Sequence, residues 1–236
     1  MRLVCRKAPL ALEYFGVAVN SGSRDERDGQ FGLAHFVEHT IFKGTGRRRA
    51  GHIINRMEAV GGDLNAFTSK EETNVYSVFP RGNLSRAIDL IADLLANSRF
   101  PVREIDRERE VVRDEIDSYL DSPSEAVYDD FEDLFFAGSQ LGHNILGTDK
   151  DLDSFTTDVC RDYLTGNFHG QRMVAYYLGP ESASRVCAKV SRGFVGMRSS
   201  GLPLDRRMPE PLAAFNVRRD METHQSHTAV SYTHLT

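Results

Sequence analysis

The chain has 236 residues, of which 40% are hydrophobic and 27% charged, and this composition is that of an ordinary globular protein. Its formal net charge is −5, and the basic residues are scattered apart from Arg47, Arg48 and Arg49, so a nucleic-acid partner is not expected. No apolar run approaches the roughly 20 residues of a membrane span, so we expect no membrane partner either.

The cysteines also limit the classes of protein to consider. Cys5, Cys160 and Cys187 are odd in number and lack C-x-x-C spacing, which argues against a disulfide framework and a thiolate zinc site. A reducing compartment fits this pattern, and the first residues lack the apolar core of a signal peptide. We expect a cytoplasmic location, or a periplasmic one if an export signal precedes Met1.

The first third of the chain alternates strands with helices. Residues 2–6 and 13–22 show the alternation of strands, and the turn 21–29 follows them. Apolar residues three and four apart predict a helix over 32–43, which Gly44 ends, and a second helix over 50–60. Residues 63–69 and 73–80 are rich in β-forming residues and predict two neighbouring strands.

The rest of the chain is mainly helical until the pattern weakens. Periodicity predicts helices over 83–98, 101–121, 124–138 and 156–168, a strand over 173–179 and a last helix through Arg192. His143 lies in the predicted loop 141–155, where we expect it to stabilise a turn. Residues 199–215 contain Pro, Gly and Ser without periodicity and indicate a linker.

The segment GLAHFVEHTIFKGT, residues 32–45, carries the clearest chemistry. His35 and His39 are four apart and therefore share one face of a helix, where two imidazoles can bind one metal ion. Glu38 lies beside this pair, and H-x-x-E-H is a known zinc peptidase motif. Two histidines in a core or on a surface remain an alternative, because catalytic zinc requires a third protein ligand.

A candidate for that ligand lies on the helix predicted over 101–121. Glu108 and Glu115 are seven residues apart and fall on the same side of the helix, with apolar Val111 and Val112 between them. Periodicity alone favours a plainer interpretation, in which both are exposed charges in ladders with neighbouring acidic and basic residues.

Four segments together resemble the insulinase and pitrilysin family of zinc metallopeptidases, in the bacterial branch related to the mitochondrial processing peptidase. They are GLAHFVEHTIFKGT, GGDLNAFTSKEETNVY, EREVVRDEI and LGHNILG, and the resemblance extends from about Arg2 to Gly196. It implies an α+β fold, in which an antiparallel sheet of five or six strands has helices packed on one face. It also implies that Glu115 is the third zinc ligand and that Glu108 supports the site.

The resemblance further implies a mechanism. Zn²⁺ held by His35, His39 and Glu115 would activate a water molecule, and Glu38 would accept its proton and return it to the leaving amine. Asn65, Ala66 and Phe67 would lie on an edge strand that binds an extended peptide through main-chain pairing. An ordinary strand with its Phe packed inward is the alternative for these three residues.

Two homologous halves make up the active members of this family. We therefore expect a zinc metallopeptidase domain over 1–197, and over 198–236 a linker with the truncated start of a second homologous domain. The expected activity is hydrolysis of oligopeptides or unfolded segments by a fragment of a two-domain enzyme, which pairs with a second half or subunit as a homodimer or heterodimer.

Two other functions remain open. The first is a non-catalytic subunit of the same family that binds peptides or a partner chain. The second is a metal lyase resembling the S-ribosylhomocysteine-cleaving enzymes, which place a cysteine near the metal. The intact H-x-x-E-H motif argues against the first, and the absence of a cysteine beside a Gly-rich turn argues against the second.

Overall fold

A computed structural model gives the fold of the chain and describes residues 1–210, 214–218 and 226–230. The strands are β1 Arg2–Lys7, β2 Leu12–Val19, β3 Asp63–Thr68, β4 Thr73–Pro80 and β5 Met173–Gly179. Within the described residues the helices are α1 Leu33–Thr40, α2 Ala50–Glu58, α3 Leu84–Asn97, α4 Val102–Leu120, α5 Pro123–Phe135, α6 Asp149–Leu152, α7 Thr157–Asn167 and α8 Ala183–Gly193. Single 3-10 turns are η1 Ser23–Asp25, η2 Ile41–Lys43 and η3 Gly170–Arg172.

The five strands form one sheet in the order β1-β5-β2-β4-β3. Strand β2 pairs antiparallel with β4 and β5, and β3 pairs antiparallel with β4 at one edge. At the other edge β1 runs parallel to β5, with Arg2 opposite Val174. The predicted α+β fold is confirmed, and the sheet is mixed because β1 lies beside the distant β5 and not beside β2, which follows it in the chain.

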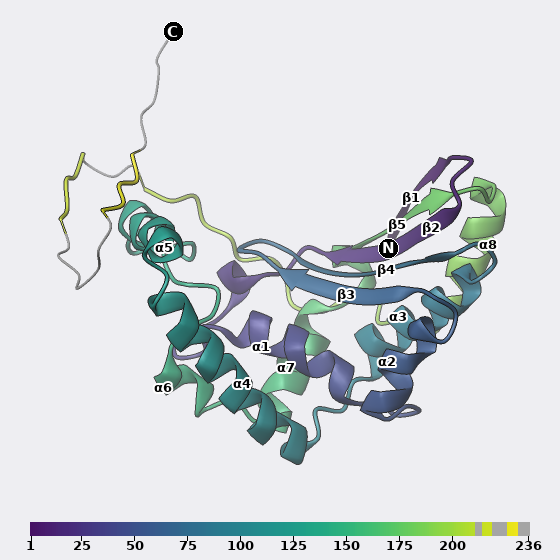
Figure 1. The fold of residues 1–236 in the computed structure, drawn as a ribbon, viewed down its shortest axis with the longest axis horizontal. Coiled ribbons are helices and arrows are strands. Elements are labelled where there is room, and N and C mark those ends of the chain that lie inside the picture. The colour runs from purple at the N-terminus through teal and green to yellow at the C-terminus, as the bar shows by residue number, and fades with distance from the viewer. Residues whose placement is uncertain (211–213, 219–225, 231–236) are drawn as a thin grey trace, which may run out of the picture.

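Helices cover one face of the sheet, as predicted, and the core lies between the two layers. Figure 1 shows α1, α2, α3 and α7 beneath the sheet, with α4 outside α1 and α8 near the β1 edge. Phe15, Val17 and Val19 of β2 are fully buried against these helices. Burial of these alternating side chains orients the sheet, because successive residues of a strand point to opposite faces.

The segment after α8 lies against the domain without forming a helix or a strand through residue 210. Buried Arg172 donates to the carbonyl oxygens of Leu202 and Pro203 at 3.0 and 2.9 Å. Arg206 forms an ion pair with Asp25 of η1 at 2.7 Å. The predicted linker is therefore anchored to the domain over its first part.

Residues 223–232 belong to the expected start of a second domain; 226–230 form neither a helix nor a strand, and the other five lie outside the described residues. No helix within the described ranges combines the length and the apolar character needed to cross a membrane.

Candidate metal centre

Helix α1 carries the histidine motif and is held by its apolar side. The predicted helix over 32–43 is divided, since α1 ends at Thr40 and the 3-10 turn η2 continues to Lys43. Leu33, Phe36 and Val37 are completely or almost completely buried. Burial of these residues fixes the rotation of the helix, so His35 and His39 turn toward α4.

His35, His39 and Glu115 converge on one point between α1 and α4. The Oε2 atom of Glu115 lies 3.7 Å from Nε2 of His35 and 3.6 Å from Nε2 of His39. The donor atoms of all three residues lie within 4.8 Å of one another, and this is the single such group found among the described residues. The three residues predicted as ligands are thus brought together.

This donor set suits Zn²⁺ in type and spacing. Two imidazole nitrogens and one carboxylate oxygen form a common set for catalytic zinc, and donors placed tetrahedrally at ~2.1 Å lie about 3.4 Å apart. Burial, together with the charge of His39, lowers the pKa of His35 to about 3. The imidazole is consequently neutral at physiological pH and offers a lone pair to a cation.

Glu108 contacts His39 on the side of the imidazole away from Glu115. Its Oε1 atom is 3.3 Å from Nδ1 of His39, and its Oε2 atom is 2.6 Å from Nζ of Lys43. Burial alone would raise the pKa of Glu108, but hydrogen bonds from His39 and Lys43 lower it overall. An ionised Glu108 accepts the Nδ1 proton of His39 and leaves Nε2 free to face Glu115.

The alternative of exposed charge ladders holds for the other side of the same helix. Arg109 pairs with Asp106 at 3.1 Å, and Arg113 pairs with Glu110 at 2.6 Å, both at i,i+3 spacing. Glu108, in contrast, is buried. Helix α4 therefore presents a solvated ladder outward and the carboxylates of Glu108 and Glu115 toward α1.

Glu38 lies beside the ligand group and is bound by the edge strand. Its Oε2 atom accepts a hydrogen bond from Oγ1 of Thr68 at 3.0 Å. Burial raises the pKa of Glu38, while the charge of His39 and the hydrogen bond from Thr68 oppose that rise. A carboxylate with a raised pKa is suited to accept a proton near neutral pH.

Asn65, Ala66 and Phe67 lie on β3, the edge strand that ends at Thr68. The Phe67 side chain is 45% exposed and packs edge-to-face against Tyr76 with ring centroids 6.4 Å apart, so it does not point into the core. The amide of Ala66 donates to Oδ1 of Asn65 at 2.9 Å. An extended peptide could pair with this edge next to Glu38.

A buried carboxylate that the sequence analysis did not single out contacts the start of α1. Glu26 accepts hydrogen bonds from the amides of Gly32 and Ala34 at 2.9 and 2.6 Å. Nε2 of His143 lies 3.0 Å from Glu26 and 3.1 Å from the carbonyl oxygen of Ser23. The available signal was an acidic residue shortly before a predicted helix, where carboxylates are favourable.

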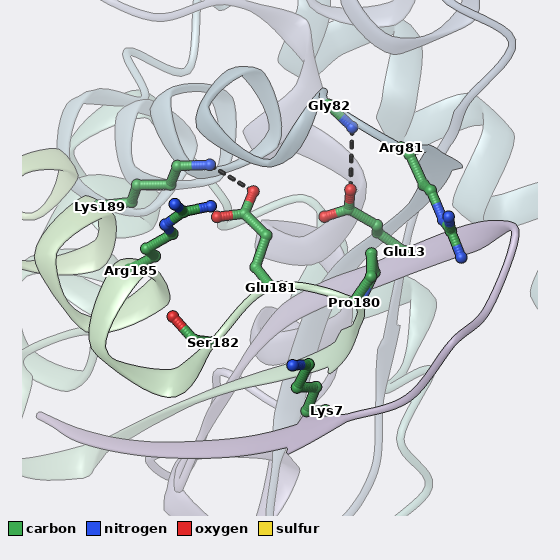
Figure 2. Close-up of a pocket in the computed structure, with 9 residues that line it drawn as sticks. All are labelled: Lys7, Glu13, Arg81, Gly82, Pro180, Glu181, Ser182, Arg185 and Lys189. Atoms are coloured by element: carbon green, nitrogen blue, oxygen red, sulfur yellow. Dashed lines mark hydrogen bonds and ion pairs between the residues drawn. The ribbon is translucent and has the colours of Figure 1, made fainter.

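A pocket lies away from this centre, at the far end of the sheet (Figure 2). It has a volume of about 730 Å³ and is open to solvent. Charged side chains line it, namely Lys7, Arg81, Arg185, Lys189, Glu13 and Glu181. None of them belongs to the candidate metal centre, which lies beside the opposite end of β4.

Sequence comparisons agree with the motif. Residues 6–149 match the family model described as insulinase, peptidase family M16. The mitochondrial-processing peptidase subunit beta of Dictyostelium discoideum is 35% identical over 191 residues, which are 80% of this chain and 41% of that protein. The uncharacterized zinc protease YmxG of Bacillus subtilis is 33% identical over 217 residues, which are 92% of this chain and 53% of that protein.

Solved structures show the same fold. A protease from Helicobacter pylori superposes with a TM-score of 0.79 at 22% identity, covering 89% of this chain and 50% of that chain. An inactive peptidase M16 domain from Pseudomonas fluorescens superposes with a TM-score of 0.81 at 14% identity, covering 89% of this chain and 52% of that chain. The chain spans about half the length of the curated relatives that it matches.

Proposed function

Because the chain belongs to the insulinase family of peptidases, peptidase family M16, we propose that it hydrolyses peptide bonds with Zn²⁺ held by His35, His39 and Glu115. The observation that carries this proposal is the convergence of three donor atoms of the right chemical types, contributed by two helices. The curated relatives of this chain include proteins named as zinc proteases.

Each polar residue around the three ligands has a defined task in such a reaction. When bound, zinc supplies Lewis-acid polarisation of a water molecule and of the peptide carbonyl. Glu38 accepts the proton of the attacking water and later donates it to the leaving amine. Thr68 holds Glu38 through its hydroxyl, and Glu108 holds His39 through Nδ1.

The substrate in this proposal is an extended peptide that adds to the sheet beside β3. Successive residues of an edge strand direct their main-chain groups alternately to the neighbouring strand and to the free edge, so Ala66 supplies main-chain hydrogen bonds to the peptide. The exposed side chains of Asn65 and Phe67 pack against the substrate. Because β3 ends at Thr68, a peptide on this edge passes Glu38. Oligopeptides and unfolded segments are extended enough to bind in this way.

The proposed enzyme works as one half of a longer chain or as one subunit of a pair. The support is the length comparison, since this chain covers 41% and 53% of two relatives that it matches. A second homologous half or a partner subunit would complete the chamber around the peptide and contribute groups that stabilise the developing oxyanion.

Replacing Glu38 by Gln in the full-length protein tests the assignment of the base. The isosteric amide keeps the size of the side chain but cannot accept the proton, so peptide hydrolysis should fall by about 10²- to 10⁴-fold with unchanged zinc content. Glu58, exposed at the end of α2, provides the matched control Glu58→Gln, which should retain full activity. Cleavage at the wild-type rate by Glu38→Gln would remove this residue from the mechanism.

The same assay separates the enzyme from a non-catalytic subunit. A wild-type protein that binds zinc and peptide, yet shows no hydrolysis with its second half present, would favour the subunit. Zinc content is measured on each sample by atomic absorption, so that lack of metal is not mistaken for lack of catalysis.

A further inference from the structure

Helix α1 begins at a residue that cannot cap it. Gly32 occupies the N-cap position with φ of +92°, and it has no side chain that could accept from the first-turn amides. The first amides of any helix need acceptors from outside the helix, and they are costly when buried without one. Residues 33–37 are all buried, so water is a poor substitute at this end.

Glu26 supplies the missing acceptors from the preceding turn. One carboxylate oxygen accepts from the Gly32 amide at 2.9 Å, and the other accepts from the Ala34 amide at 2.6 Å. The Glu26 side chain is fully buried. It spans two amides of the first turn, and therefore fixes both the position and the rotation of the helix start.

A second segment holds the Glu26 carboxylate in place. Nε2 of His143 faces two acceptors, Glu26 and the carbonyl oxygen of Ser23, so this nitrogen carries the proton and donates to them. The imidazole stacks on Phe31 with ring centroids 4.2 Å apart and planes inclined by 24°. Lys70 donates to the carbonyl oxygen of His143. The orientation of Glu26 is thus set by groups distant in the sequence.

Backbone contacts reinforce the same junction. A Cβ atom on Gly32 would lie 2.4 Å from the carbonyl oxygen of Leu146, and one on Gly147 would lie 2.0 Å from that of Phe31. Both distances are far below van der Waals contact, so the loop carrying His143 meets the start of α1 backbone to backbone. The junction leaves little room for the helix to shift.

Of the three proposed ligands, His35 is the one whose position a change at this junction would affect most. It directly follows Ala34, whose amide Glu26 binds, and it belongs to the first turn of α1. Glu108 orients His39 through Nδ1, whereas Nδ1 of His35 is buried and has no hydrogen-bond partner among the described residues. The backbone is therefore the main means by which the fold directs His35 toward Glu115.

We propose that Glu26, oriented by His143, is a positioning residue that sets His35 for metal binding by capping α1. This inference rests on the proposed function. It assigns Glu26 no contact with metal or substrate and predicts an effect on metal affinity that exceeds any general loss of stability.

The experiment compares two buried glutamates. Glu13 also accepts a backbone amide hydrogen bond, from Gly82 at 2.9 Å, and lies in the wall of the distant pocket shown in Figure 2. Glu26→Gln and Glu13→Gln are prepared in the full-length protein, and folding is checked by circular dichroism. Zn²⁺ affinity is measured by chelator competition, and the visible spectrum is recorded with Co²⁺ in place of zinc.

Glu26→Gln should bind Zn²⁺ about tenfold more weakly, the size expected when a helix cap is impaired, and should show an altered Co²⁺ spectrum. Hydrogen exchange at the Ala34 amide should accelerate in the metal-free protein. Glu13→Gln should match the wild type in affinity and spectrum. His143→Ala, which keeps Glu26, should shift affinity in the same direction and serves if Glu26→Gln does not fold.

Two kinds of result would overturn the inference. Wild-type affinity in folded Glu26→Gln or His143→Ala would remove the positioning role. Equal losses of affinity in the Glu26 and Glu13 variants would reduce it to a general effect of stability. Failure of the proposed function is recognised separately, because the wild type would then bind no Zn²⁺, or His35→Ala would bind it as tightly as the wild type does.

Discussion

The two helices that form the candidate metal centre differ in how the fold holds them. Six of the eight residues of α1 are buried, whereas three of the nineteen residues of α4 are. Helix α1 lies beneath the sheet, and Glu26 fixes its start (Figure 1). Helix α4 lies outside α1 and leads into α5, which has no buried residue.

This difference divides the proposed ligands into two kinds. His35 and His39 are presented by a rigid element, with both side chains largely covered. The Glu115 side chain is 43% exposed and stands on a peripheral helix. A carboxylate on such a helix can adjust to the cation after the imidazoles have engaged it, because elements with few buried contacts open and shift at the lowest cost in free energy.

The largest expected effect lies in the core side of α1. Phe36→Ala should lower the free energy of unfolding by about 3–5 kcal/mol, because Phe36 is fully buried and its ring packs on that of Phe155 with centroids 5.3 Å apart. Val111→Ala, on the side of α4 where Val111 is 49% exposed, should change it by less than about 0.5 kcal/mol. Urea denaturation measures both, and similar values would show that the two helices are equally integral to the core.

The second effect is on zinc affinity. His35→Ala should weaken binding by more than about 100-fold, beyond the range typical of losing an outer-shell partner. Glu115→Gln keeps a side-chain oxygen that can bind zinc, and this residue stands on the adjustable helix. The loss of zinc affinity should therefore be smaller than for His35→Ala. Chelator competition gives both constants, and a greater loss for Glu115→Gln would reverse the assignment of the rigid and adjustable ligands.

A third test asks which helix the metal orders. Addition of Zn²⁺ should slow amide hydrogen exchange more strongly in α4, around Glu115, than in α1, whose amides are already protected by burial. Exchange followed by mass spectrometry resolves the two segments. Equal slowing in both would contradict the division into a fixed and an adjustable part.

The smallest effect concerns the outer face of α4. Arg113 pairs with Asp149 and Asp153 at 2.5 and 3.0 Å, and the aspartate side chains are exposed while that of Arg113 is partly exposed. Arg113→Ala should lower the melting temperature only slightly at low salt and not measurably at about 1 M salt, where such pairs are screened. A large shift that persists at high salt would mean that α4 is fixed more firmly than its exposure indicates.

Local pattern was sufficient to predict most elements of the fold. The predicted strands at 63–69 and 73–80 correspond to β3 and β4, and the predicted helix at 101–121 corresponds to α4. The spacing of Glu108 and Glu115 placed both on one side of that helix. The parallel pairing of β1 with β5 has no such signal, because two strands some 170 residues apart in sequence show no local pattern that reveals their pairing.

The contacts at the start of α1 could not be predicted from the sequence for a similar reason. Glu26 lies in a charged turn that has the composition of solvated surface, and its burial depends on a loop more than 110 residues away. The sequence predicts that His143 stabilises a turn, and its Nε2 atom bonds to Ser23 and Glu26 at the distant turn η1. The roles of Glu26 and His143 both depend on two segments that come together only in the folded chain.

The contact between Gly32 and Gly147 also bears on how such a fold can be recognised from many sequences. Methods that infer contacts from correlated substitutions need both positions to vary, and here a side chain at either one would collide with the opposing main chain. Two positions that tolerate only glycine share no covariation. This backbone contact would therefore leave no signal of correlated substitution in an alignment, although the folded structure shows it directly.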